Sequence, residues 1–183
     1  MEYKKYAQYR VYMSILYRII PLRMLRRTPG VHFDEMVPSD IPKIDGIDRV
    51  IHAANSISPG PVQTDTVSVK RPWYMHPGQD DNLMVLQGTR YIDIYNPVGN
   101  QSASFIITPD KVYKNEKLYY DGPAMVVWPA GIFHRIISGS DGSISLNFAT
   151  RTHKFEGIFI FTNSWKRKLN SFCRLLLSIL ICH

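Results

Sequence analysis

The chain has 183 residues, of which 45% are apolar and 20% charged, a composition that suits one globular domain and excludes wholesale disorder. No run of about 18 uncharged apolar residues is present, which argues against a conventional transmembrane helix. The net charge of +7 lies at the two ends, since residues 1–30 balance to +6, residues 151–183 to +5 and residues 31–150 to −4, a distribution that argues against a nucleic-acid-binding core.

Residues 1–27 form a basic segment whose periodicity predicts a helix. Tyr6, Met13, Leu16 and Ile20 share one helical face, and polar side chains lie opposite. Two interpretations stay open, because such a helix packs either on the domain or a partner chain, or lies on a membrane surface. We expect residues 1–40 to form a helical extension and linker.

The next segment is punctuated by proline and glycine. Apolar residues recur between Ile41 and Ala54, which favours a short helix or an irregular packed segment. Residues 56–62 contain Pro59-Gly60-Pro61 and predict a stiff loop. We expect the main domain to cover residues 41–162.

From Asp65 onward, short runs rich in Val, Ile, Tyr and Phe alternate with Gly, Asn, Asp and Pro turns. These runs predict strands near 65–70, 72–76, 82–86, 90–95, 103–108, 124–128, 133–138 and 143–149. Closely spaced short strands favour an antiparallel sandwich or barrel. Residues 157–162 would supply a further closing strand.

Residues 163–183 form a basic and then apolar tail, for which we expect a short helix. The tail would dock on the barrel or on a dimer partner, or would attach to a membrane surface through Lys166, Arg167 and Lys168. Cys173 and Cys182 both lie in this tail and cannot staple the main domain, so we expect a cytoplasmic protein.

The candidate site residues lie in two segments, residues 74–88 and residues 122–138. Strand side chains alternate between faces, so Tyr74 and His76 point the same way at the end of one predicted strand. Asp81 begins the next strand, and His134 follows a Pro-x-Gly turn. Two imidazoles and one carboxylate from three strand ends would meet in a barrel mouth, which is a common site for ferrous iron and suits zinc or manganese.

The first segment resembles the first motif of the cupin superfamily, His-x-His, three or four residues, Glu, six residues, Gly. With Gly88 setting the register, Asp81 takes the Glu position, His76 the second His position and Tyr74 the first. The two departures are a phenol in place of an imidazole and a carboxylate one carbon shorter.

The second segment resembles the second cupin motif, Gly, five residues, Pro-x-Gly-x-x-His, three residues, Asn. Pro129, Gly131 and His134 match it, whereas Ser138 stands at the Asn position and six residues separate Gly122 from Pro129. The resemblance covers roughly residues 65–150.

The resemblance implies an all-β, cupin-like jelly-roll barrel, here with an N-terminal helical extension and a short C-terminal helix. It further implies that His76, Asp81 and His134 hold iron, manganese, zinc or nickel, beside a small organic ligand in the barrel mouth. Tyr74 would act as a hydrogen-bond donor in the pocket or as a general acid, and is alternatively an ordinary aromatic at the rim of the sheet. Gln79 would bind and orient the cofactor or ligand, and is alternatively a solvated loop residue. Cupins act as dioxygenases and isomerases, among other roles, and commonly form homodimers.

Other interpretations stay open. Asp80 replaces Asp81 as the metal ligand if the loop register slips by one, and His76 alternatively caps a strand and bonds to a neighbouring aspartate. His134 is alternatively a satisfied interior histidine. The second hypothesis for function is a non-catalytic cupin that binds a metabolite or carbohydrate without essential metal, and the third is an adaptor that acts through the basic ends.

Overall fold

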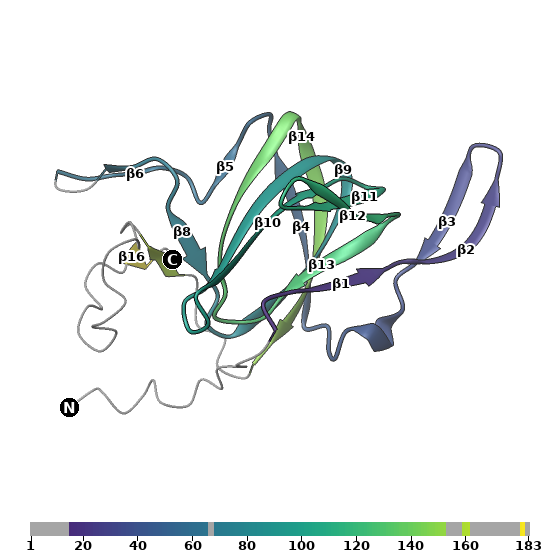
Figure 1. Cartoon of the computed structure of the whole chain (residues 1–183), viewed down its shortest axis with the longest axis horizontal. Helices are drawn as coiled ribbons and strands as arrows, with labels where there is room; N and C mark the ends of the chain where they lie inside the picture. Colours follow the sequence, from purple (N-terminus) through teal and green to yellow (C-terminus); the bar gives the residue numbers. More distant parts are fainter. Residues whose placement is uncertain (1–14, 66–67, 153–158, 162–179, 182–183) are drawn as a thin grey trace.

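A computed structural model describes residues 15–65, 68–152, 159–161 and 180–181, and its secondary structure is almost entirely β (Figure 1). A single 3-10 turn at Pro38–Asp40 is the exception among these residues. The predicted all-β class is therefore confirmed for the described part of the chain. No helix within the described ranges has the length and apolar character needed to cross a membrane.

Two long antiparallel strands form the spine of the sheet. β9 (Gln79–Asn96) and β14 (Phe133–Arg151) pair along their whole length, from Gln79 opposite Arg151 to Tyr95 opposite Phe133. The strands predicted at 82–86 and 90–95 are thus parts of one element, as are those at 133–138 and 143–149.

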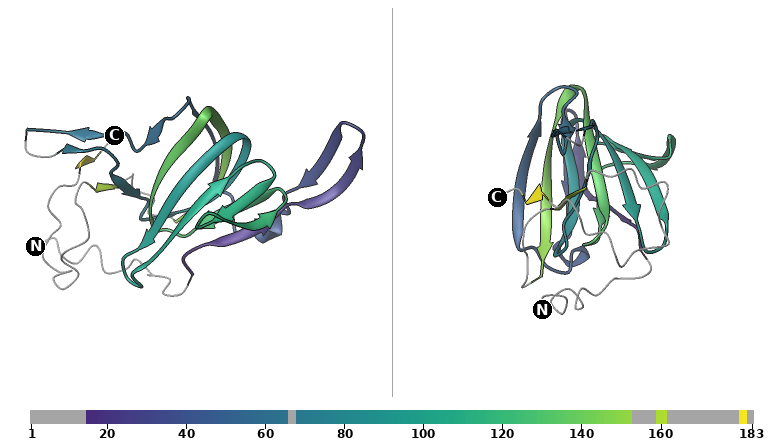
Figure 2. Two further views of the ribbon diagram at one scale, coloured as in Figure 1. Left: turned by 45° about the horizontal axis from the view of Figure 1, so that its top comes forward. Right: turned by 90° about the vertical axis from the view of Figure 1, so that its left-hand side faces the viewer.

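Other strands extend this spine on both sides, and the sheet curls into a half-barrel (Figure 2). One flank beside β9 contains β10 (Gln101–Ile107), β11 (Lys111–Lys114), β12 (Lys117–Asp121) and β13 (Ala124–Trp128). The other flank, beside β14, contains β4 (Gly46–His52), β5 (Ile57–Ser58) and β8 (Trp73–Met75), with β15 (Phe159–Phe161) and β16 (Leu180–Ile181) beyond β8. A short ribbon, β6 (Val62–Gln63) with β7 (Ser68–Val69), stands apart from this sheet.

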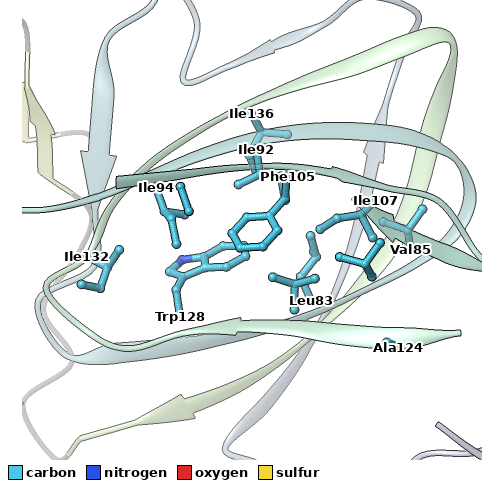
Figure 3. Packing of buried hydrophobic residues seen from close by; sticks show 13 residues of the cluster. Leu83, Val85, Ile92, Ile94, Phe105, Ile107, Ala124, Trp128, Ile132 and Ile136 are labelled. Carbon is cyan, nitrogen blue, oxygen red and sulfur yellow. The ribbon is translucent and has the colours of Figure 1, made fainter. Parts of the chain in front are cut away.

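The core lies inside the curl because strand side chains alternate between faces. Leu83 and Val85 from one half of β9 belong to the same buried cluster as Ile92 and Ile94 from the other half and Trp128 from β13 (Figure 3). All of these side chains are no more than 3% exposed. The core thus fills one part of the half-barrel and leaves the remainder to polar residues.

The predicted N-terminal helix is wrong where the structure describes it. Arg18–Pro21 form strand β1, which pairs with β13, and Arg23–Thr28 (β2) pair with Val31–Glu35 (β3) in a projecting hairpin (Figure 1). Ile19 packs on the main core and Ile20 on a second cluster behind β13. The open edge of β13 explains the strand, since pairing there satisfies backbone groups and both faces of β1 find apolar partners. Residues 1–14 lie outside the described part.

Two further elements differ from expectation. The segment expected as a helix or irregular run between Ile41 and Ala54 contains strand β4, because its side chains alternate between a half-buried and an exposed face. The predicted C-terminal helix is not supported, since Leu180–Ile181 form strand β16, and most of that tail falls outside the described residues. Strand β15 at Phe159–Phe161 lies within the closing strand predicted at 157–162.

Candidate metal centre

The polar part of the half-barrel encloses a cavity of about 300 Å³. Its walls are formed mainly by β4, β8, β9 and β14, and Ser58 of β5 and Trp128 of β13 also line it. Tyr74, His76, Gln79 and Asp81 line this cavity, and His134 is buried behind them at 1% exposure. The topology therefore brings all five site residues expected from the sequence into one neighbourhood.

Strand pairing explains why three distant residues converge. His134 on β14 lies opposite Tyr74 of β8 on one side and opposite Ile94 of β9 on the other. His76 follows the end of β8, and Asp81 lies opposite Trp128 in the β9–β13 ladder. The ligand atoms of His76, Asp81 and His134 all lie within 4.8 Å of one another.

The two imidazoles face a single carboxylate oxygen. Asp81 Oδ2 lies 3.7 Å from His76 Nε2 and 3.6 Å from His134 Nε2, both too long for hydrogen bonds. This oxygen is buried and has no hydrogen-bond partner among the described residues. Leaving a buried anionic oxygen without a partner costs free energy, so a cation bound at this oxygen would stabilise the folded chain.

The other carboxylate oxygen is held firmly. Asp81 Oδ1 accepts hydrogen bonds from Gln79 Nε2 and from Asn147 Nδ2, each at 2.8 Å. Gln79 in turn accepts from Arg151 Nε at 2.9 Å through its own oxygen. The two amide donors therefore fix the orientation of the carboxylate and leave Oδ2 directed at the histidines.

His134 presents a lone pair to this point. Its Nδ1 lies 3.0 Å from the carbonyl oxygen of Ile132, and a carbonyl only accepts, so Nδ1 carries the proton and Nε2 does not. Burial lowers the pKa of His134 to about 4, against the opposing effect of the Asp81 charge. At neutral pH His134 Nε2 is thus an acceptor that faces the Asp81 carboxylate at 3.6 Å, which fits a bound metal ion.

The remaining candidates occupy different roles. The Tyr74 ring lies 3.8 Å from the His134 ring centroid, and burial raises the pKa of its hydroxyl, so it stays a neutral phenol and a hydrogen-bond donor. Asp80, the fallback ligand, instead accepts a hydrogen bond from the Ala130 amide at 2.7 Å. His76 Nδ1 is buried with no partner among the described residues.

Sequence reasoning missed several cavity residues. Asp48 and His52 were hidden because their strand was expected to be helical or irregular. Arg90 carried a detectable signal, since the period of two that places Ile92 and Ile94 inside the barrel also places Arg90 there. A polar residue in phase with a buried apolar series is the feature that would have identified it.

Neither a family model nor a curated protein matches this sequence. Several solved structures do match this chain. A sugar 3,4-ketoisomerase from Thermoanaerobacterium thermosaccharolyticum in complex with TDP is 13% identical, with 78% of this chain and 85% of that one covered and a TM-score of 0.52. A TDP-quinovose 3,4-ketoisomerase from Campylobacter jejuni is 11% identical, with coverages of 80% and 92% and a TM-score of 0.52.

A third solved structure is a dTDP-4-dehydrorhamnose 3,5-epimerase from Sulfolobus tokodaii. It is 14% identical, with 77% of this chain and 73% of that one covered, and its TM-score is 0.51. At these identities the likeness shows a shared fold alone.

Proposed function

We propose that this protein is a cupin that holds one divalent metal ion between His76, Asp81 and His134 and acts on a small organic ligand in the adjoining cavity. The observation that carries the proposal is the buried Asp81 Oδ2, which faces two imidazole nitrogens and has no donor among the described residues. Two imidazoles and one carboxylate suit iron, manganese, zinc or nickel.

The metal would supply polarisation of a ligand carbonyl or activation of a bound ligand. The chain's own residues would orient the ligand and donate a proton to it. Tyr74 offers a neutral hydroxyl for orienting a ligand oxygen or for donating a proton to it, and its ring lies against His134. Gln79 would act through Asp81, whose Oδ1 accepts its hydrogen bond.

Among cupin reactions, an isomerase type acting on a small sugar-like ligand is favoured over dioxygenation. The solved structures with this fold are described as sugar ketoisomerases and an epimerase. Such reactions move a proton beside a carbonyl, for which histidine and tyrosine side chains are suitable acids and bases. We also propose, from the cupin resemblance, a homodimer, and a cytoplasmic location from the placement of the cysteines.

The second candidate is a cupin that binds a metabolite or carbohydrate without essential metal. Tyr74 favours it, because the residue at the first histidine position of the motif is a neutral phenol and a poor metal ligand. In this alternative, Asp81 and the histidines would bind ligand hydroxyl groups directly.

Metal analysis of the purified full-length protein separates the two candidates. We expect near-stoichiometric divalent metal in the wild type, its loss in His76→Ala and His134→Ala, and its retention in His32→Ala, where an exposed histidine on the β2–β3 hairpin is removed. Circular dichroism would establish that each variant keeps its β structure. A folded wild type that neither contains nor takes up divalent metal would reject the first candidate.

A further inference from the structure

The cavity contains a buried cation that the metal centre does not use. Arg90 on β9 is 1% exposed and lines the cavity together with Asp81. Its Nε donates to Ser143 Oγ at 3.1 Å, and one terminal nitrogen donates to the carbonyl of Val50 at 3.4 Å. A guanidinium has five N–H donors, so these two bonds leave capacity for a ligand.

No carboxylate among the described residues forms an ion pair with Arg90. The cavity's two acids are committed elsewhere. Asp48 pairs with Arg151 at 3.3 Å and accepts from Asn147, and Asp81 is held by amides and faces the histidines.

Arg90 stays charged at neutral pH, because burial lowers its pKa only to about 10. A buried charge without a counter-ion is strongly destabilising, which makes an incoming anion favourable.

Further polar groups line the cavity together with Arg90. His52 and Ser58 also line it, and His52 Nδ1 is buried with no partner among the described residues. Burial and the nearby Arg90 charge both lower the pKa of His52, so this ring is neutral at neutral pH and supplies no counter-charge. Tyr74 also lines this cavity; burial has the largest effect on the pKa of its hydroxyl, and the charges of Asp81 and Arg90 act on that pKa in opposite directions.

We propose that Arg90 binds a carboxylate of the cavity's ligand, which makes that ligand a small monocarboxylic acid. The inference rests on the proposed function for the other end of the cavity, since the reacting atoms of the acid would lie beside Tyr74, His76 and Asp81. It narrows the small sugar-like ligand of the proposed function to one that carries a carboxylate.

A carboxylate fits better than a phosphate for two reasons. One guanidinium carries a single positive charge and a planar pair of donors, which matches a carboxylate in both charge and shape. A phosphate dianion would need a second cation, and Arg151, also in the cavity wall, is already bonded to Asp48 and Gln79. A cavity of about 300 Å³ also lies at the small end of ligand sites.

Calorimetric titration of the full-length protein with acetate, butyrate and valerate, each against its uncharged amide, tests this inference. We expect at least one acid to bind at least about tenfold more tightly than its amide, and Arg90→Gln to weaken that acid at least about tenfold. Arg49→Gln, on the exposed face of β4, should bind as the wild type does. If Arg90→Gln fails to fold, Arg90→Lys and the acid–amide comparison on the wild type decide.

The inference is overturned if acids and amides bind alike, if no acid binds, or if Arg90→Gln binds as the wild type does. Inorganic phosphate that binds more tightly than every acid, with the same dependence on Arg90, overturns the carboxylate assignment. Asp81→Asn separates this inference from the proposed function, because it should lose metal while the acid still binds more tightly than its amide and that preference still depends on Arg90. Loss of acid binding in Asp81→Asn but not in Arg90→Gln would place the carboxylate at the metal end and reject the role of Arg90.

Discussion

The two carboxylate oxygens of Asp81 have different surroundings. One oxygen is fixed by Gln79 and Asn147, and the other is buried without a donor and faces two imidazoles. The amides therefore determine where the free oxygen lies, and their removal should loosen the metal ligand without deleting it.

Gln79→Ala should lower the affinity for the divalent metal by about tenfold, because Asp81 then loses one of the two donors that orient it. Chelator competition on the full-length protein measures the dissociation constant. Gln87→Ala is the matched control, since that glutamine lies exposed on the same strand. Equal metal affinity in the two variants would contradict the positioning role of Gln79.

Ser138 occupies the asparagine position of the second cupin motif, and the structure gives it a structural task. Its buried hydroxyl accepts from the Ser56 amide at 2.9 Å and donates to the Ala53 carbonyl at 2.6 Å, which ties the segment between β4 and β5 to β14.

Ser138→Ala should lower the free energy of unfolding by about 1–3 kcal/mol, because two buried backbone groups lose a partner. Urea denaturation measures the change. Ser102→Ala on the exposed face of β10 should change stability by less than about 0.5 kcal/mol. An unchanged midpoint for Ser138→Ala would show that water replaces the hydroxyl.

At the scale of elements, the curl of the barrel depends on a pair of glycines. Gly88 and Gly142 both have φ of +73° and lie at the bulge where β9 and β14 bend together. A Cβ on Gly88 would overlap the carbonyl of Gly142. Gly88 lies between the strands predicted at 82–86 and 90–95, and in the structure it bends one strand that continues through it.

Gly88→Ala should destabilise the fold by about 2–4 kcal/mol, from the left-handed backbone conformation and from overlap with rigid backbone. Thermal or urea unfolding measures it. Gly60→Ala is the control, because no atom lies within 4 Å of a Cβ placed there and its φ is outside the left-handed region. A Gly88→Ala variant as stable as Gly60→Ala would mean that the two strands separate at little cost.

At the scale of the whole molecule, metal and fold are linked because the three proposed ligands come from three separate parts of the sheet. His76 follows β8, whereas Asp81 lies in β9 and His134 in β14. An ion held by all three binds the folded chain in preference to the unfolded one, and so stabilises the assembled barrel.

Divalent metal at about one hundred times its dissociation constant should stabilise the wild type by about 2.7 kcal/mol, or roughly 5–10 °C in melting temperature. Differential scanning calorimetry before and after chelator treatment measures the shift. The His76→Ala/His134→Ala double variant should show none. An equal shift in the double variant would indicate metal binding elsewhere on the chain.

The all-β class and five residues of the candidate site, which are Tyr74, His76, Gln79, Asp81 and His134, were predicted from the sequence, whereas Asp48, His52, Arg90 and Asn147 were not. Alternation with a period of two and turn residues are local properties, so the strands around Asp81 and His134 could be located without a structure. The spacing of Gly88 and of the Pro-x-Gly turn then set the register of both motifs.

Tertiary structure decided the remainder, because pairing partners and counter-charges are far apart in the chain. Arg18–Pro21 form a strand because the edge of β13 is open to pairing there. No local sequence pattern indicates this. Arg90 has no counter-ion among the described residues. The sequence does not show this, because it depends on how β4, β9 and β14 surround one cavity. A strand edge or a buried charge is satisfied by whatever the fold brings beside it, and that neighbour is set by long-range packing.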